Sequence, residues 1–315
     1  MLSEPRSFIY TYAFHKEEES LCMLEMRSFF GKDSETGVIE SMINIDPSRS
    51  PFIRERIDVI IEGADINDII AKVKELQLEG ATFKVIFVKD AGDEKWAFAD
   101  RRRIEREVGL AVPGQPELDQ PDLLFGFLKV NGRWVFGLYH SSEAIWLHHQ
   151  QKPHSYSTAL STRVARAVAN IAVPNPAGVK AIDPCCGIGT VVVEALSMGI
   201  GIVGSDNNPL ILAGTRENIA HFGYETEIKY MDLRDVTGEY NVAIIDMPYN
   251  LCSVITAEEQ LEMLERTRKF AEKLVIVTIE PIDPVIVEAG FEIVDRGVVR
   301  KGNFIREVIV CRRNS

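Results

Sequence analysis

Three features are scarce in this sequence, and each scarcity excludes a class of protein. The five cysteines are Cys22, Cys185, Cys186, Cys252 and Cys311. They form no C-x-x-C pair, which argues against a disulfide framework and a paired-cysteine zinc site, so we expect no bound metal. The longest apolar run is interrupted by Glu194 and is shorter than the roughly 20 residues that span a membrane. The N-terminus lacks the apolar core of a secretory signal. The sequence therefore predicts a soluble, cytoplasmic protein with no membrane association.

Positive charge is also in the minority. Lys and Arg number 35 against 47 Asp and Glu, so the formal net charge is −12. This balance argues against a protein that coats nucleic acid by charge alone, but it leaves room for an enzyme with one local basic face. The 315 residues, 46% of them hydrophobic, suffice for a sizeable core and about two domains.

The order of the expected elements divides the chain into a mixed front part and a regular back part. In the front part we expect an amphipathic helix from Ile66 to Gly80 and a hairpin around Asn131-Gly132, a dipeptide suited to a type I′ turn. From residue 158 onward, helical and strand patterns alternate. Such alternation is typical of an α/β fold with a doubly wound, mainly parallel sheet.

A glycine loop between a strand and a helix is the most informative segment. The sequence AIDPCCGIGTVVVEAL places a strand end at Asp183, glycines at 187 and 189, and a helix start at Thr190. About 20 residues further on, a second strand ends at Asp206, an acid suited to ribose hydroxyls. Such a loop serves S-adenosylmethionine, a dinucleotide or no ligand at all. Asp183 favours the first, since an acid beside the loop attracts an ammonium group.

A second motif, IIDMPYN at 244–250, follows another expected strand. In an open α/β sheet, this position places Asp246 at the carboxyl ends of the strands, beside the glycine loop. A strand followed by a structural proline turn is the alternative interpretation. The pairing of the two motifs favours a functional site.

At these two motifs the chain resembles a known family. Asp246-Met-Pro-Tyr249 is similar to the D-P-P-Y or N-P-P-Y motif of amino-group methyltransferases, and AIDPCCGIGT resembles the cofactor loop of RNA guanine-N2 methyltransferases that carry a THUMP domain. The segments FKVIFVK, IEREVGLAV and ELDQPDLLFGFLKVNGRWVFGLY resemble a THUMP domain. Within this family the resemblance is closest to the archaeal and eukaryotic enzymes that methylate guanosine at position ten of tRNA.

The resemblance implies a domain plan and a fold class. The plan comprises an α+β, ferredoxin-like segment at 1–55, a THUMP-like RNA-binding domain at 56–146, a linker at 147–157 and a methyltransferase domain at 158–315. The last domain is expected to be a Rossmann-like, class I methyltransferase fold with a mainly parallel seven-stranded sheet. S-adenosyl-L-methionine is the implied cofactor and RNA, chiefly tRNA, the implied partner. The acidic charge leaves room for a partner subunit that supplies part of the RNA-binding surface.

The resemblance also assigns roles to residues. The catalytic set would be Asp246, Met247, Pro248 and Tyr249, with Met247 standing where the family has proline. The Asp246 carboxylate and the residue 247 carbonyl would hold the amine hydrogens, while Tyr249 stacks on the extruded base. The cofactor set would be Asp183, Cys185, Gly187, Gly189, Thr190, Asp206 and Asp232. Within it, Asp206 would take the ribose hydroxyls and Asp232 the adenine amine, unless Asp232 is a solvated loop acid.

Several residues keep two interpretations. The segment His154–Tyr156 either lines the pocket or caps the next helix. The basic residues that either contact RNA or form solvated faces are Arg101, Arg102, Arg103, Arg106, Arg163, Arg166, Arg300, Lys301 and Arg306. The leading function is methylation of a guanosine N2 amine in tRNA. The alternatives are N6-adenine or rRNA guanine-N2 methylation, a non-catalytic tRNA-binding protein, and a nicotinamide-dependent oxidoreductase.

Overall fold

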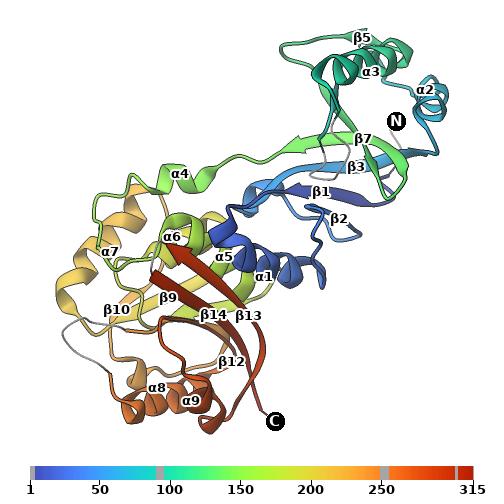
Figure 1. Ribbon diagram of the computed structural model, residues 1–315. Helices are drawn as coiled ribbons and strands as arrows, with labels where there is room; N and C mark the ends of the chain where they lie inside the picture. The colour runs from blue at the N-terminus through green and yellow to red at the C-terminus, as the bar shows by residue number, and fades with distance from the viewer. Residues whose placement is uncertain (1–3, 90–95, 249–254, 302–303, 315) are drawn as a thin grey trace. The chain divides into compact units, whose positions relative to one another are not determined.

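The structure is a computed structural model that describes residues 4–89, 96–248, 255–301 and 304–314 (Figure 1). The chain forms two compact units. The N-terminal unit comprises Met1–Ala13, Asp33–Ser48 and Phe52–Glu143, and the C-terminal unit comprises Phe14–Lys32, Arg49–Pro51 and Ala144–Ser315. Within the described ranges, no helix is long and apolar enough to cross a membrane.

The described part of the N-terminal unit contains a seven-stranded sheet in the order β2-β1-β3-β7-β6-β4-β5. Its strands are β1 (Phe8–Tyr12), β2 (Val38–Ser41), β3 (Ile53–Gly63), β4 (Thr82–Phe87), β5 (Gln115–Pro116), β6 (Leu123–Val130) and β7 (Arg133–Ser141). Helices α2 (Ile66–Val73) and α3 (Phe98–Ala111) belong to the same unit. Aromatic side chains such as Phe83, Phe125 and Phe136 fill its core, because alternate residues of neighbouring strands point to one face.

Two local expectations in this unit have different outcomes. The hairpin at Asn131-Gly132 is confirmed: it joins β6 to β7, with φ of 50° and 78° at its two residues. Helix α2, in contrast, ends at Val73 rather than near Gly80, so the predicted length was wrong. The chain turns away early because Leu78 packs into the core, and this burial outweighs the continuing helical pattern.

A second seven-stranded sheet lies in the described part of the C-terminal unit, in the order β10-β9-β8-β11-β12-β14-β13. Its strands are β8 (Lys180–Asp183), β9 (Gly201–Asp206), β10 (Ile228–Tyr230), β11 (Tyr240–Asp246), β12 (Ala271–Thr278), β13 (Phe291–Lys301) and β14 (Phe304–Arg313). Strand β14 is antiparallel to both neighbours, whereas β10, β9, β8, β11 and β12 pair in parallel. The mainly parallel, Rossmann-like sheet expected from the sequence is confirmed.

Helices cover both faces of this second sheet (Figure 1). They are α1 (Glu19–Phe30), α4 (Ile145–His149), α5 (Thr162–Ala172), α6 (Thr190–Ser197), α7 (Pro209–His221), α8 (Ala257–Phe270) and α9 (Asp283–Glu288). Helices α1, α5 and α6 pack on one face, and α8 and α9 pack on the other (Figure 1). Parallel sheets are covered in this way because their strands are apolar on both sides.

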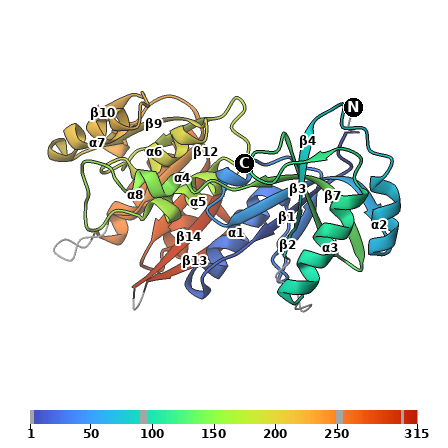
Figure 2. The same ribbon diagram turned by 90° about the horizontal axis from the view of Figure 1, so that it is seen from above.

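Helix α1 belongs to the C-terminal unit although it stands early in the chain. It lies beside β13 (Figure 2), where a Cβ atom added to Gly297 would sit 3.0 Å from Leu24 Cβ. Arg27 of α1 also pairs with Asp295 of β13, with Nε 2.8 Å from Oδ2. The segment 1–55, expected as one region, is thus divided, since β1 and β2 belong to the N-terminal unit.

Candidate active site

The glycine loop connects β8 to α6 by a tight turn. Strand β8 ends at Asp183, and α6 begins at Thr190. Gly187 and Gly189 have φ of 51° and 79°, in the left-handed region that glycine adopts without steric cost. A Cβ atom at Gly189 would lie 2.9 Å from Cγ2 of Thr215, so a side chain at this position would force the Thr215 methyl group of α7 to move.

Polar side chains from α7 and β9 hold this loop in place. Thr215 Oγ1 donates to the Gly187 carbonyl at 2.6 Å, and Asn218 Nδ2 donates to the Ile188 carbonyl at 2.9 Å. The Gly187 N–H donates to Asp206 Oδ2 at 2.9 Å. Neither Thr215 nor Asn218 was predicted from the sequence as part of the site. The sequence pattern that points to them is a pair of polar side chains three positions apart, which places both on one face of the helix.

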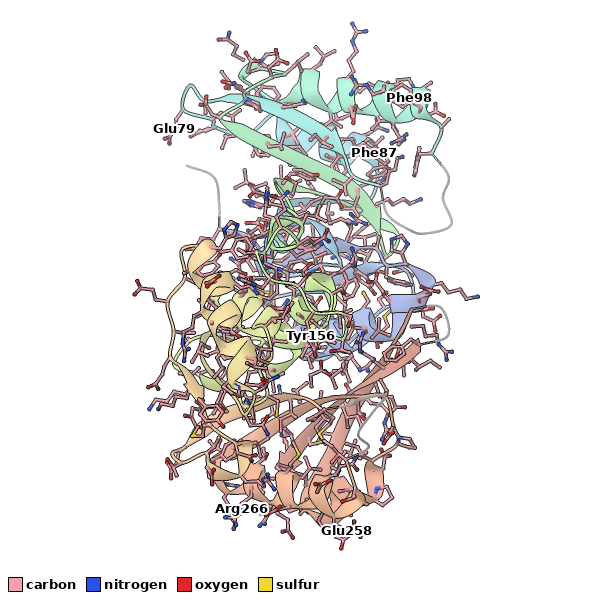
Figure 3. The ribbon with its side chains drawn as sticks, turned by 90° about the vertical axis from the view of Figure 1, so that its left-hand side faces the viewer. Glu79, Phe87, Phe98, Tyr156, Glu258 and Arg266 are labelled. Carbon is pink, nitrogen blue, oxygen red and sulfur yellow. The ribbon has the colours of Figure 1, made fainter. Side chains whose placement is uncertain are left out.

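A cavity of about 450 Å³ opens beside the loop, within the range typical of small-molecule sites. From the predicted cofactor set, Asp183, Cys185, Gly187, Thr190, Asp206 and Asp232 line it. From the predicted catalytic set, Asp246, Met247 and Pro248 line it, and Tyr249 lies outside the described residues. Gly189 shapes the turn without lining the cavity. Tyr156, labelled in Figure 3, lies at the cavity wall with 57% of its surface exposed.

Negative charge dominates this cavity. Four aspartates line it, and Arg234 is the one cationic side chain among the described lining residues. Burial raises the pKa of Asp183 well above its usual value, and the nearby Asp246 and Asp206 carboxylates raise it further. Arg234 pairs with Asp232 at 2.8 Å and so offsets the charge of one of the four aspartates, while Asp183, Asp206 and Asp246 lie outside this pair. The site therefore suits a ligand with positive charge.

One carboxylate oxygen of Asp246 has no hydrogen-bond donor among the described residues. Asp246 ends β11, and burial raises its pKa to about 7 against the opposing charge of Arg306. The oxygen without a donor is the buried Oδ1 atom. A buried acceptor without a donor is costly, which indicates an atom reserved for a ligand. The next residue, Met247, is anchored through its N–H to the Val277 carbonyl at 2.8 Å.

Asp206 and Asp232 are both held by hydrogen bonds. Asp206 Oδ1 accepts from the Asn208 N–H at 2.9 Å, in addition to the bond from the glycine loop. The Asp232 carboxylate accepts from the side chains of Arg234 and Asn207, and Arg234 holds its pKa well below the usual range. Asp232 is therefore a fixed group in the cavity wall and not a freely solvated loop acid.

The structure also places the residues that kept two interpretations. His154 does not line the cavity, because its side chain pairs with Glu217 and its N–H donates to Asn218. The cap of α5 is Ser161, so the capping interpretation of 154–156 was wrong.

Among the basic residues, Arg166 is 1% exposed and pairs with Glu194, so both interpretations, an RNA contact and a solvated face, were wrong for it. Arg163 pairs with Glu18 at 3.0 Å. On α3, Arg102 pairs with Glu105 at 2.7 Å and Arg103 with Glu107 at 3.0 Å, as expected for a charged helix face.

The chain is similar to a family of methyltransferase domains and to two curated tRNA methyltransferases. Residues 150–277 match the family model described as "RMKL-like, methyltransferase domain". The tRNA (guanine(10)-N2)-dimethyltransferase of Methanothermobacter thermautotrophicus is 30% identical over 215 residues, which cover 64% of this chain and 61% of that protein. The protein of the same name from Methanocaldococcus jannaschii is 22% identical over 220 residues, or 61% of this chain and 62% of that protein.

The chain thus spans about three fifths of the length of these curated relatives. Among solved structures, TrmN from Thermus thermophilus aligns with 98% of this chain and 100% of its own, at 16% identity and a TM-score of 0.49.

Proposed function

We propose that this chain, whose residues 150–277 match a methyltransferase domain family, is an S-adenosyl-L-methionine-dependent RNA methyltransferase. Its substrate in this proposal is the exocyclic N2 amine of a guanosine in tRNA. The names of the two curated relatives, both tRNA (guanine(10)-N2)-dimethyltransferases, support this choice of base and RNA. Since tRNA is the substrate, we place the reaction in the cytoplasm.

The charge of the cavity is the observation that carries the proposal. When bound, S-adenosyl-L-methionine supplies an electrophilic methyl group on a cationic sulfonium. Asp183 and Asp246 present carboxyl groups toward such a cation, while Asp206 lies at the end of the next strand for ribose hydroxyls. A nicotinamide dinucleotide would instead place a pyrophosphate among four aspartates, a like-charge arrangement that costs binding energy. The cavity therefore disfavours the oxidoreductase alternative.

Asp246 is the acceptor for the substrate amine in this proposal. An exocyclic amine is a weak nucleophile, because its lone pair is delocalised into the ring. Oδ1, which lacks a donor among the described residues, would accept one N–H and hold the nitrogen toward the methyl group. After transfer the amine carries an excess proton. A carboxyl with a pKa of about 7 is matched to receiving that proton near neutral pH.

RNA binding requires positive charge that the chain offers only locally. The exposed arginines of α3 are the leading contacts, in the region expected to be THUMP-like; they are Arg102, Arg103 and Arg106. Arg101 lies over the Phe98 ring at 5.6 Å, and Phe98 is 70% exposed (Figure 3). An exposed aromatic ring beside arginine is a surface on which unpaired bases stack. The net charge of −12 also leaves a place for a partner subunit that supplies basic surface.

The test uses tRNA from a strain that lacks this protein, purified enzyme and labelled S-adenosyl-L-methionine, with nucleoside mass spectrometry as the readout. We expect N2-methylguanosine with the wild type and none with Asp246→Ala. Asp235→Ala removes an exposed carboxyl outside the cavity and is expected to keep full activity. N6-methyladenosine as the product would overturn the choice of base, and labelled methyl in neither nucleoside would overturn the proposal.

A further inference from the structure

Arg306 of β14 projects from the same face of the sheet as Asp246. Both strands border β12, where Val277 lies opposite Asp246 on one side and Val308 on the other. Laterally paired residues share a face, and so do residues two apart on a strand. Arg306 therefore shares the face of Val308 and Asp246. Since β14 runs antiparallel to β12, Arg306 also stands toward the carboxyl edge of the sheet, where Asp246 ends β11.

Contacts with Thr158 and Phe304 hold the Arg306 guanidinium in this position. Nη2 donates to the carbonyl of Thr158 at 3.0 Å, and Thr158 lines the cavity together with Asp246. The guanidinium carbon also lies 4.9 Å from the centre of the Phe304 ring, within the range of a cation–π contact. A half-buried arginine with both contacts loses little freedom when it serves a neighbouring group.

Apart from Arg234, the described titratable groups that line the cavity with Asp246 are acids, thiols and a phenol. They are Asp183 at the end of β8, Cys185 and Cys186 in the glycine loop, Asp206 at the end of β9, Asp232 beyond β10, Glu259 in the first turn of α8 and Tyr156. Arg234 also lines the cavity, but it is shared between Asp232 and Glu262. Arg306 is the cation whose charge opposes the effect of burial on the pKa of Asp246.

We propose that Arg306 is a positioning residue that keeps Asp246 in its ionised, hydrogen-bond-accepting form. A protonated carboxyl group has one oxygen committed as a donor, so it accepts an N–H of the substrate amine less well. With the arginine in place, more of the protein is competent near neutral pH. The inference rests on the proposed function, because it assigns a purpose to the charge state of Asp246 in that reaction.

The experiment measures the ionisation of Asp246 directly and then its effect on turnover. Protein labelled with [4-¹³C]aspartate is titrated by NMR, and the Asp246 resonance is assigned as the one missing from Asp246→Asn. The same variants are assayed for kcat/KM against pH. We expect Arg306→Gln to raise the pKa of Asp246 by about one unit, since an opposite charge at close range commonly shifts a carboxyl by 1–3 units.

In the rate profile, the acid limb of kcat/KM moves to higher pH by the same amount. The loss approaches tenfold below the wild-type pKa and vanishes at high pH, where the carboxyl is ionised in both proteins. Arg306→Lys keeps the positive charge, so the acid limb of its kcat/KM profile is expected to stay at the wild-type pH. Arg300→Gln is the matched control, because it removes an exposed arginine from the partner strand β13, where Arg300 lies opposite Ile305.

An Asp246 resonance that titrates alike in wild type and Arg306→Gln overturns the inference. If Arg306→Gln does not fold, Arg306→Met, which keeps the apolar stem against Phe304, replaces it with the same expected shift. The two proposals fail separately. A shifted resonance in a protein that methylates no guanosine overturns the proposed function alone, and methylation with an unshifted resonance overturns the role of Arg306 alone.

Discussion

Arg166 donates a hydrogen bond from Nη1 to Oε2 of Glu194 over 2.9 Å, and both side chains are buried between α5 and α6. The second carboxylate oxygen of Glu194 is 2.8 Å from Nδ1 of His149. Arg166 Nε also donates to the Arg49 carbonyl at 2.8 Å. This closed network positions α6, whose first residue follows the glycine loop.

Breaking the Arg166–Glu194 pair is predicted to destabilise the protein strongly. Arg166→Met leaves Glu194 buried without its main counter-charge, and such a loss costs about 3–5 kcal/mol. The free energy of unfolding in urea measures the effect. The double variant Arg166→Met/Glu194→Gln should lose less free energy of unfolding than the two single variants lose in sum. Lys229→Met breaks an exposed ion pair with Glu227 and should change nothing measurable; an equal loss there would contradict this account.

Gly189→Ala is predicted to weaken cofactor binding and stability together. A left-handed φ in a residue with a Cβ costs about 1–3 kcal/mol, and the Thr215 methyl group adds a steric clash. Gly178 has a similar φ of 71°, and a Cβ atom there would meet open space. Gly178→Ala therefore measures the free-energy cost of the backbone conformation alone.

Thr215→Ser removes the clashing methyl group but keeps the hydroxyl that binds the loop. The double variant Gly189→Ala/Thr215→Ser should therefore recover part of the affinity, measured by calorimetric titration with S-adenosyl-L-methionine. No recovery would show that the clash with α7 is not the cause.

Arg234→Met is predicted to weaken S-adenosyl-L-methionine binding by about 2- to 10-fold. Arg234 fixes the Asp232 carboxylate and connects it to Glu262 of α8 at 3.2 Å. Freeing such a side chain means ordering it again on binding, which costs about 0.5–1.5 kcal/mol. Calorimetric titration gives the dissociation constant. Arg296→Met removes a comparable pair, with Asp283 at 2.6 Å, outside the cavity lining. Its affinity should match the wild type, and equal weakening in both variants would refute the prediction.

Glu25 is predicted to make stability fall as pH rises. Its carboxyl is buried in α1, and burial raises its pKa from 4.5 to about 7, against hydrogen bonds from Ser50 and Asn170. The folded protein therefore binds this proton more tightly than the unfolded chain. Its stabilising contribution is complete below pH 4.5 and is lost as pH rises through about 7.

Glu25→Gln removes this dependence. Between pH 4 and pH 8, the free energy of unfolding of the variant should therefore rise relative to that of the wild type by up to about 3 kcal/mol. The wild type and the variant are compared at each pH, because Asp183 and Asp246 also have raised pKa values and also make the free energy of unfolding fall as pH rises. Urea unfolding at several pH values gives the difference. Glu19→Gln, at an exposed position of the same helix, is the control. A constant gap between wild type and Glu25→Gln would be inconsistent with a raised pKa.

Features that depend on neighbouring residues were predictable. The Asn131-Gly132 turn and the glycine loop follow from the backbone freedom of a few adjacent residues. The placement of Asp246 at the end of a strand followed from the regular alternation of strands and helices. The end of α2 did not follow, because Leu78 is drawn into a core that the local pattern does not describe.

The sequence by itself determined the types of the elements, the mainly parallel sheet and the acids at its carboxyl edge, since periodicity and turn chemistry are encoded locally. Only the tertiary structure decided that Arg166 is buried against Glu194 instead of facing solvent. It also decided that α7 holds the glycine loop through Thr215, and that Arg306 shares a sheet face with Asp246. Burial, ion pairing and pKa depend on which distant side chains meet in space, and no local spacing records that.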